Sequence, residues 1–336
     1  MKITDRRRLP HAELCVPVFG LGGAQLGGLY RAMSDDAANT LVDAAWSQGV
    51  RHFDTAPYYG YTRSEQRLGE ALASRPRDEF VLSTKVGRVM RPGATVWASD
   101  DGWIDPLPFR PHFDYTHAGV MRSFEDSLQR LRVSHVDLLY VHDIGQATHL
   151  ELHELYWEQL TSGGGFRALE ELRRAGLARA IGLGVNEWPV VHAAMREFDL
   201  DCSMLAGRYT LLEQQSLSPF LDDCIARGHA IVAAGPFNSG VLAGGTSFNY
   251  AQAPEHVITR VRALDAVCRE FDVALPAAAL QFPLAHPAVV ACVAGAHSAD
   301  ELRQNIAWLE TPIPAAFWQA LQQRGLIDGR APVPTA

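Results

Sequence analysis

Eight short apolar runs recur along this sequence, separated by segments with the spacing of amphipathic helices. The runs have the length of strands and show no polar–apolar alternation, which is typical of parallel strands covered on both faces. They are VFGLGG (18–23), HFDTA (52–56), VLSTKV (81–86), DLLYVHD (137–143), AIGLGV (180–185), CSMLAG (202–207), AIVAAGP (230–236) and VVACVAG (289–295). Eight strands alternating with helices predict a (β/α)8 TIM barrel.

The segments between the runs support this alternation. SDDAANTLVDAAWSQG begins with a Ser/Asp cap signal and ends near Gly49. A doubly wound open sheet is the alternative fold. The glycine-rich stretch GLGGAQLGG (20–28) lacks the GxGxxG spacing that such a sheet uses for dinucleotides, so the barrel is preferred. No low-complexity linker divides the chain, and we expect one domain over residues 1–336.

Composition limits the partners of the chain. The 336 residues carry a net charge of −8 without a clustered basic face, which argues against nucleic acid. The apolar runs are too short to span a membrane, and no apolar stretch follows the basic N-terminus, so we expect no signal peptide. The five cysteines form no CxxC pair, which predicts reduced thiols and a cytoplasmic protein.

Two segments are longer than their neighbours. The first, about 87–117, follows the third predicted strand and is rich in aromatic residues, including Trp97 and Trp103. Long loops of this kind in compact domains are usually functional, so we expect an ordered lid or substrate wall. The second is the proline-containing tail 325–336, which we expect to lie as a strap over the active-site face.

Polar side chains stand where three consecutive predicted strands end. Asp54 and Tyr59 follow the second strand, Lys85 lies near the end of the third, and His142 ends the fourth. In a barrel the carboxyl ends of the strands form the active-site face, so these four side chains should converge. We call Asp54, Tyr59, Lys85 and His142 the tetrad. Tyr58, by contrast, is expected to serve packing.

The tetrad has the chemistry of proton transfer. A free tyrosine has a pKa of about 10, and a nearby ammonium lowers it toward the range useful for acid–base catalysis. Asp54 would keep Lys85 charged and oriented, and His142 would hydrogen-bond the substrate oxygen. A carbonyl or hydroxyl that exchanges a proton here suggests hydride transfer to or from a nicotinamide.

The motifs FDTAPYYG with SEQRLGEAL, STKVG, DLLYVHD and GLGVN together resemble the aldo-keto reductase superfamily. FDYTHAGVMRSFEDSLQRL and AGRYTLLEQ are similar to its subgroup of L-fucose (D-threo-aldose 1-) and pyridoxal 4-dehydrogenases. The resemblance implies that Tyr59 is the proton donor and acceptor, tuned by Lys85 and Asp54, with His142 orienting the substrate.

The resemblance also implies a reaction, namely NAD(P)-dependent oxidation of C1 of an aldose such as L-fucose to the lactone. Oxidation of pyridoxal to its lactone and NADPH-dependent reduction of small aldehydes remain alternatives. A regulatory barrel without activity is the alternative outside the enzymes. We expect a monomer or weak homo-oligomer that binds a small-molecule substrate.

The same resemblance implies the residues that bind the cofactor. Asn186 matches the position that binds the nicotinamide carboxamide, and Tyr209 matches the aromatic residue on which the nicotinamide ring stacks. The remaining candidates follow three strand ends: Gly22, Gly23, Gly235, Pro236, Phe237, Asn238, Gly240, Leu242, Gly295, Ser298, Glu301 and Asn305.

The cofactor preference depends on the adenosine end. Gly295 and Glu301 stand where NADP-selective relatives carry Lys or Arg, and a carboxylate would repel a 2′-phosphate, so NAD is favoured. Arg303 and His297 lie nearby and keep NADP open. Ser298-x-x-Glu301 is also a helix capping box, which explains the glutamate without any ligand.

Substrate contacts are predicted for Tyr59 and His142 of the tetrad, and for Asp143, Trp97 and Trp103. Asp143 is explained equally well as a cap for the element that follows it. Trp97 and Trp103 would line the pocket from the long loop, or simply hold that loop down. No histidine cluster has metal-ligand spacing, so no metal is expected.

Overall fold

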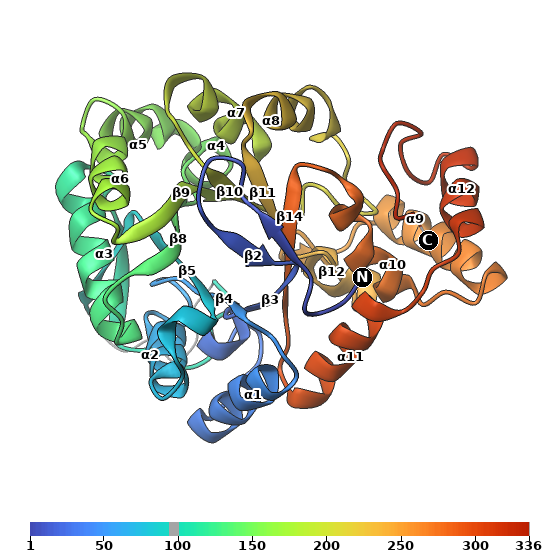
Figure 1. Cartoon of the computed structure of the whole chain (residues 1–336), viewed down its shortest axis with the longest axis horizontal. Coiled ribbons are helices and arrows are strands. Elements are labelled where there is room, and N and C mark those ends of the chain that lie inside the picture. Colours follow the sequence, from blue (N-terminus) through green and yellow to red (C-terminus); the bar gives the residue numbers. More distant parts are fainter. Residues whose placement is uncertain (94–100, 336) are drawn as a thin grey trace.

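The computed structural model describes residues 1–93 and 101–335 of the chain. In this part of the chain, eight parallel strands close into a barrel in the spatial order β10-β11-β14-β3-β4-β5-β8-β9 (Figure 1). The barrel strands are β3 (Phe19–Gly22), β4 (His52–Asp54), β5 (Val81–Val86), β8 (Val136–His142), β9 (Ala178–Val185), β10 (Cys202–Ala206), β11 (Ala230–Ala234) and β14 (Val289–Gly295). Each lies within or overlaps one of the eight apolar runs, so the predicted (β/α)8 TIM barrel is confirmed.

Strand β8 shows why these runs are apolar throughout. All of its residues are buried, and β5 and β9 pair with it on either side. Leu138 and Tyr140 belong to the cluster inside the barrel, whereas Leu139 and Val141 belong to the layer between strands and helices. Successive side chains point to opposite faces of a strand, and here both faces are covered, so no polar alternation arises.

Helices surround the barrel (Figure 1). They are α1 (Asp35–Ser47), α2 (Arg63–Leu72), α3 (His117–Leu131), α4 (Gln146–His149), α5 (His153–Leu160), α6 (Gly165–Arg174), α7 (Trp188–Glu197), α8 (Asp222–Arg227), α9 (Glu255–Glu270), α10 (Leu275–Gln281), α11 (Ala299–Glu310) and α12 (Ala315–Gln323). Helix α3 is representative. Thr116 caps it by accepting a hydrogen bond from the Gly119 amide, and Val120, Phe124 and Leu131 bury its inner face.

A hairpin closes the amino-terminal end of the barrel. Its strands, β1 (Arg6–Arg8) and β2 (Cys15–Pro17), lie across the barrel in Figure 1. Leu9, Leu14 and Val16 of this hairpin join the interior cluster, together with Val81 and Val290 near the starts of two barrel strands. The opposite end, where the strands finish, is therefore the one left for a site.

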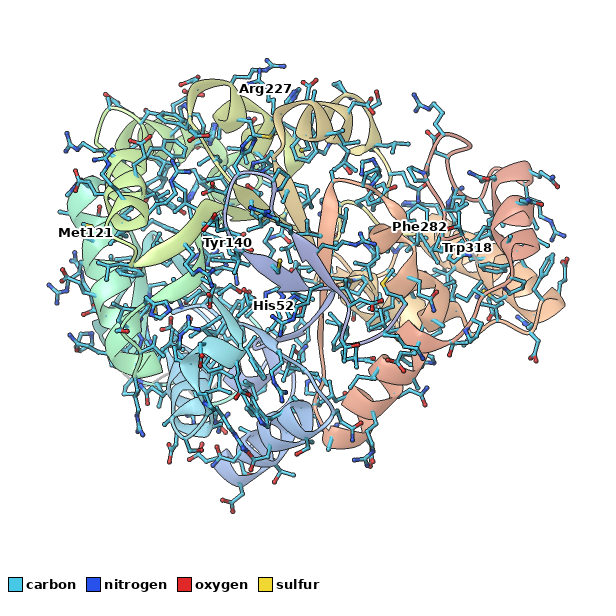
Figure 2. The ribbon with its side chains drawn as sticks, in the orientation of Figure 1. His52, Met121, Tyr140, Arg227, Phe282 and Trp318 are labelled. Atoms are coloured by element: carbon cyan, nitrogen blue, oxygen red, sulfur yellow. The ribbon has the colours of Figure 1, made fainter. Side chains whose placement is uncertain are left out.

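The side chains follow the same layers. In Figure 2, His52 and Tyr140 lie near the middle of the barrel, whereas Met121 and Arg227 lie at the periphery. Phe282 and Trp318 are both fully buried and pack against each other with ring centroids 6.4 Å apart. They fill the space between the carboxyl-terminal helices and the barrel.

The long segment after the third predicted strand is more regular than the sequence indicated. The segment after β5 is a hairpin of β6 (Arg88–Pro92) and β7 (Phe109–Phe113). Residues 94–100, with Trp97, lie outside the described residues. A second hairpin, β12 (Ser247–Phe248) with β13 (Ala251–Gln252), follows β11.

The carboxyl-terminal tail is held by hydrogen bonds to two parts of the barrel. The Arg260 guanidinium of α9 donates to the carbonyls of Gly325 and Leu326, and the Asp328 amide donates to Gln214 in the loop after β10. Among the described residues 325–335, no hydrogen bond joins the tail to a side chain of the tetrad. The tail is held against α9 and the loop after β10, and a strap across the active-site face stays a prediction.

Within the described ranges, no helix is long and apolar enough to cross a membrane. In the same residues, no group of three or more His, Cys, Asp and Glu side chains is arranged to hold a metal ion.

Candidate active site

The tetrad assembles at the carboxyl ends of three neighbouring strands. Asp54 ends β4, Lys85 is the last residue but one of β5, and His142 ends β8, and these strands are adjacent in the barrel. Tyr59 comes from the turn after β4. This turn packs directly on another loop, because a Cβ at Gly60 would lie 2.2 Å from the Gly27 carbonyl oxygen. Glycine at position 60 is therefore needed to bring Tyr59 to its place.

Lys85 and Asp54 form a buried ion pair. The Lys85 ammonium lies 2.8 Å and 3.1 Å from the two Asp54 carboxylate oxygens and 2.9 Å from the Thr55 carbonyl. Only 2% of the Lys85 side chain and 4% of the Asp54 side chain are exposed. The Ser83 hydroxyl also donates to Asp54, at 2.7 Å. The pair is thus fixed in geometry as well as paired in charge.

The ion pair keeps the ammonium charged. Burial lowers the pKa of Lys85, but the charge of Asp54 and the hydrogen bonds that the ammonium makes to Asp54 and Tyr59 raise it by more, so the pKa lies above its ordinary value. Lys85 is therefore a permanent positive charge at any pH near neutrality.

Tyr59 corrects one expectation. Burial raises the pKa of its hydroxyl, and although Lys85 lowers that pKa by its charge and a hydrogen bond, the pKa stays above its ordinary value. The Lys85 ammonium lies 4.7 Å from the centroid of the Tyr59 ring. Lys85 lowers the pKa of Tyr59 by less than expected, because Asp54 raises that pKa and because desolvation of the phenolate dominates.

His142 is neutral. Burial lowers the pKa of its imidazole well below the ordinary range, and the charges of Arg88 and Lys85 lower it further. Its Nδ1 is buried without a hydrogen-bond partner, whereas its Nε2 lies 3.4 Å from an Asp143 carboxylate oxygen. A neutral imidazole with its proton on Nε2 can donate a hydrogen bond to a substrate oxygen without delivering charge.

A second buried network lies beside the tetrad. Arg88, at the start of β6, donates to Asp143 at 2.5 Å, and the Asn186 amide donates to the other Asp143 oxygen at 3.1 Å. Asp143 has a left-handed backbone, with φ of 47°. Its carboxylate is therefore held by two protein partners. Sequence reasoning missed Arg88, because nothing local in RVMRP indicates a partner 55 residues away.

Two further residues hold the backbone of His142 in place. The Tyr115 hydroxyl donates to the His142 carbonyl at 2.8 Å and lies 2.9 Å from Nε2 of His149. The tyrosine has a single proton, so His149 must donate in this contact. Both residues are buried and fix the end of β8, and neither was predicted from the sequence.

Aromatic rings wall the tetrad on one side. Trp103 is buried, and its ring centroid lies 5.5 Å from that of Tyr58 and 5.6 Å from that of Tyr59. The Arg88 guanidinium covers Tyr58, 3.9 Å from the ring centroid. The structure therefore brings Trp103 to the tetrad and packs Tyr58 between Trp103 and Arg88.

The other half of the barrel face is formed by strands that end in small residues. Four adjacent strands, β10, β11, β14 and β3, end in the small residues Ala206, Ala234, Gly295 and Gly22. A Cβ at Gly295 would lie 2.1 Å from Oε1 of Gln25, so any larger residue there would have to displace the end of the Gln25 side chain. The row of small residues runs from the strand beside Asn186 to the strand beside Asp54.

Polar groups for a dinucleotide lie along this row. Asn238, in the segment after β11 that also holds Gly235, Pro236, Phe237 and Gly240, has a buried Oδ1 without a partner. At the far end, the N-terminus of α11 follows Gly295 and Ser298. A helix N-terminus and backbone amides favour an anionic ligand, so these residues fit a nicotinamide dinucleotide lying extended across the strand ends.

The capping interpretation of Glu301 is supported in a modified form. The Glu301 amide donates to the Ser298 hydroxyl at 3.2 Å, and the Glu301 carboxylate accepts from the His297 amide at 2.7 Å. Asn305 donates to the Gly295 carbonyl at 3.2 Å and so fixes this strand end. All of these contacts are internal to the protein.

Three other residues predicted to bind the cofactor lie where they support the protein structure. Tyr209 is 1% exposed, and its ring packs against Phe282 and His286, so the structure does not bring it to the face. Leu242 is fully buried in the core and supports the loop from beneath. The Gly23 amide donates to the Asp54 carbonyl at 2.7 Å, so Gly23 braces the tetrad.

Comparison with known proteins agrees with this geometry. Residues 18–324 match the Aldo/keto reductase family. The chain is 49% identical to a pyridoxal 4-dehydrogenase of Microbacterium luteolum, over 98% of this chain and 99% of that protein. It is 41% identical to a D-threo-aldose 1-dehydrogenase of a Pseudomonas species, over 94% and 96%.

A solved structure shares the fold. The holo form of an aldo-keto reductase from Bacillus halodurans has a TM-score of 0.73 and 25% identity, over 98% of this chain and 97% of that chain. The buried Asp54–Lys85 pair, the adjoining Tyr59 and the neutral His142 all lie within the matched residues. The barrel, the geometry of this site and the similarity to these relatives together show that the chain belongs to the aldo/keto reductase family of nicotinamide-dependent oxidoreductases.

Proposed function

We propose that this oxidoreductase is a dehydrogenase that oxidises C1 of an aldose such as L-fucose to the lactone, with NAD as the preferred cofactor. The observation that carries the proposal is the tetrad, in which a permanently charged, buried Lys85 adjoins Tyr59 opposite a neutral His142. A regulatory barrel has no need for an ion pair buried beside a proton-transferring phenol.

The roles of the four side chains follow from their chemistry. In the oxidation, His142 donates a hydrogen bond to the hydroxyl oxygen on the reacting carbon, and Tyr59 as phenolate takes the hydroxyl proton. Lys85 stabilises that phenolate, and Asp54 holds Lys85 in position. A bound nicotinamide would supply the acceptor for the hydride from that carbon. Asn186 would hold the carboxamide of the nicotinamide, and the segments that follow β11 and β14 would hold the rest of the dinucleotide.

Pyridoxal is the second candidate substrate. The pyridoxal 4-dehydrogenase relative is 49% identical, and the aromatic wall of Trp103 and Tyr58 suits a flat pyridine ring. Both candidates close to a cyclic hemiacetal and give a lactone on oxidation. The shared requirement is therefore a hemiacetal hydroxyl that Tyr59 and His142 can reach together.

A substrate screen tests the proposal. We expect L-fucose and related aldoses to reduce NAD faster than NADP, followed by absorbance of the reduced nicotinamide, with the lactone identified by mass spectrometry. Pyridoxal is measured in parallel, and its faster oxidation would make it the substrate. If neither aldoses nor pyridoxal are oxidised with either cofactor, the proposed dehydrogenase function is wrong.

Glu301→Lys tests the cofactor preference. We expect the ratio of NADP to NAD turnover to rise by roughly fivefold, because a lysine beside the 2′-position attracts a phosphate that the carboxylate repels. Glu301→Gln is the matched control, since it removes the charge but keeps an acceptor for the His297 amide. An unchanged ratio in both variants would leave helix capping as the whole role of Glu301.

A further inference from the structure

The tip of the β12–β13 hairpin reaches a residue of the proposed cofactor site. The Tyr250 hydroxyl donates to Oδ1 of Asn186 at 3.2 Å, across 64 residues of sequence. Asn186 follows β9, whereas the hairpin follows β11, so the contact crosses the end of β10 between them. Nothing in the local sequence SFNYAQ indicates this placement.

Several contacts hold the tip in its place. Asn249 and Tyr250 have φ values of 48° and 64°, a conformation that asparagine tolerates and a bulky aromatic residue rarely adopts. The Tyr250 amide donates to the Ser239 hydroxyl, and Arg208 donates both to the Asn249 side chain and to the Asn186 carbonyl. Bulky residues in such conformations persist where the surroundings fix them, often at functional sites.

The ring of Tyr250 is largely exposed to solvent, whereas its hydroxyl contacts the proposed cofactor site. The residue is 59% exposed, which leaves much of its ring open, while its hydroxyl is engaged by the hydrogen bond to Asn186. Burial raises the pKa of this hydroxyl well above its ordinary value, and the charges of Tyr59 and Asp143 raise it further. The hydroxyl therefore stays protonated and acts as a donor to Asn186.

Tyr250 and Asp143 together fix the orientation of the Asn186 amide. Its Nδ2 donates to Asp143 and its Oδ1 accepts from Tyr250, so the two ends cannot be exchanged. One N–H and one lone pair of the amide remain for a ligand. A primary carboxamide, which offers one acceptor and a donor side by side, matches this remaining pair.

We propose that Tyr250 is a cofactor-contacting residue: its ring covers the nicotinamide end of the dinucleotide, and its hydroxyl orients Asn186 toward the carboxamide. The inference rests on the proposed function, in which Asn186 is the carboxamide partner. It assigns to Tyr250 the ring contact that the buried Tyr209 does not make. It also confines that contact to one end of the cofactor.

Binding of NAD and of ADP-ribose, which lacks the nicotinamide, tests this assignment. The dissociation constants are measured by titration calorimetry of the wild type, Tyr250→Ala and Tyr250→Phe. We expect Tyr250→Ala to weaken NAD binding by about tenfold, as loss of an aromatic contact with a flat base does, and to leave ADP-ribose binding unchanged. Tyr250→Phe keeps the ring and should weaken NAD binding by about threefold through loss of one hydrogen bond.

The controls separate this inference from the proposed function. Ile225→Ala, at an exposed position of α8, should change neither constant. Equal weakening of NAD and ADP-ribose in Tyr250→Ala would show that the tyrosine only supports the hairpin, and no weakening of NAD would show that it makes no contact. Either result overturns the inference about Tyr250. NAD binding by the wild type would at the same time support the proposed cofactor. If the wild type binds neither ligand, the proposed function itself fails, and this inference with it.

Discussion

Replacing Tyr59 by phenylalanine is expected to lower kcat for substrate oxidation by roughly 10³-fold, the range that a positioned acid–base group contributes. The ring and its packing on Trp103 remain, so the fold should be intact. What is lost is the hydroxyl of a ring that adjoins Lys85 and His142. Turnover is measured by absorbance of the reduced nicotinamide, with NAD binding as a check that the site is otherwise formed.

The pH profile makes this prediction sharper. Oxidation needs the Tyr59 phenolate, and burial holds the pKa of Tyr59 above its ordinary value, so wild-type kcat should rise with pH through the alkaline range. The residual rate of Tyr59→Phe should lack that rise. His142 has its pKa well below the ordinary range, so no loss of activity from its protonation is expected near neutrality.

Tyr58→Phe is the matched control for Tyr59→Phe. It removes a hydroxyl from the neighbouring ring of the aromatic wall and is expected to lower kcat by less than tenfold. A Tyr59→Phe enzyme that oxidises substrate at the wild-type rate, or a Tyr58→Phe enzyme that loses as much activity, would contradict the assigned roles.

Replacing Lys85 by methionine is expected to affect both activity and stability. Asp54 would then be a buried carboxylate with only the Ser83 hydroxyl as a partner. Breaking a buried ion pair on one side costs about 3–5 kcal/mol, so the free energy of unfolding should fall by that amount, measured by urea denaturation. Activity should fall by roughly 10³-fold, since no cation stabilises the Tyr59 phenolate.

The double variant Lys85→Met with Asp54→Asn separates the two effects. It removes the uncompensated charge and keeps a side chain of similar shape, so most of the lost stability should return. Activity should not return, because the ammonium is still missing. If the double variant regained activity, Lys85 would act only through the fold. If Lys85→Met had wild-type stability, the ion pair would not be buried in solution.

The barrel was predictable because its signals are local. Eight short runs without polar alternation are typical of strands covered on both faces, and the intervening helices carry caps such as Ser34 and Thr116. The tetrad was predictable for the same reason. Asp54, Lys85 and His142 stand at the ends of consecutive strands, and parallel strands of a barrel all end on one face.

The packing of the loops was not predictable in this way. The spacing of Tyr209 matched a cofactor position, but the chain turns its ring into the core against Phe282, 73 residues further along. The charge of Lys85 was expected to lower the pKa of Tyr59, but the depth at which the ring is buried decides the net direction. Burial depends on loops from several strands at once.

The sequence by itself therefore determined the (β/α)8 barrel and the tetrad, because strand and helix periodicity act over a few residues and fix which side chains stand at strand ends. Only the tertiary structure decided that Arg88 neutralises Asp143, that Tyr250 reaches Asn186 and that Tyr209 is withdrawn into the core. These contacts join residues 55 or more positions apart through loops, whose path depends on packing against the whole barrel rather than on any local pattern.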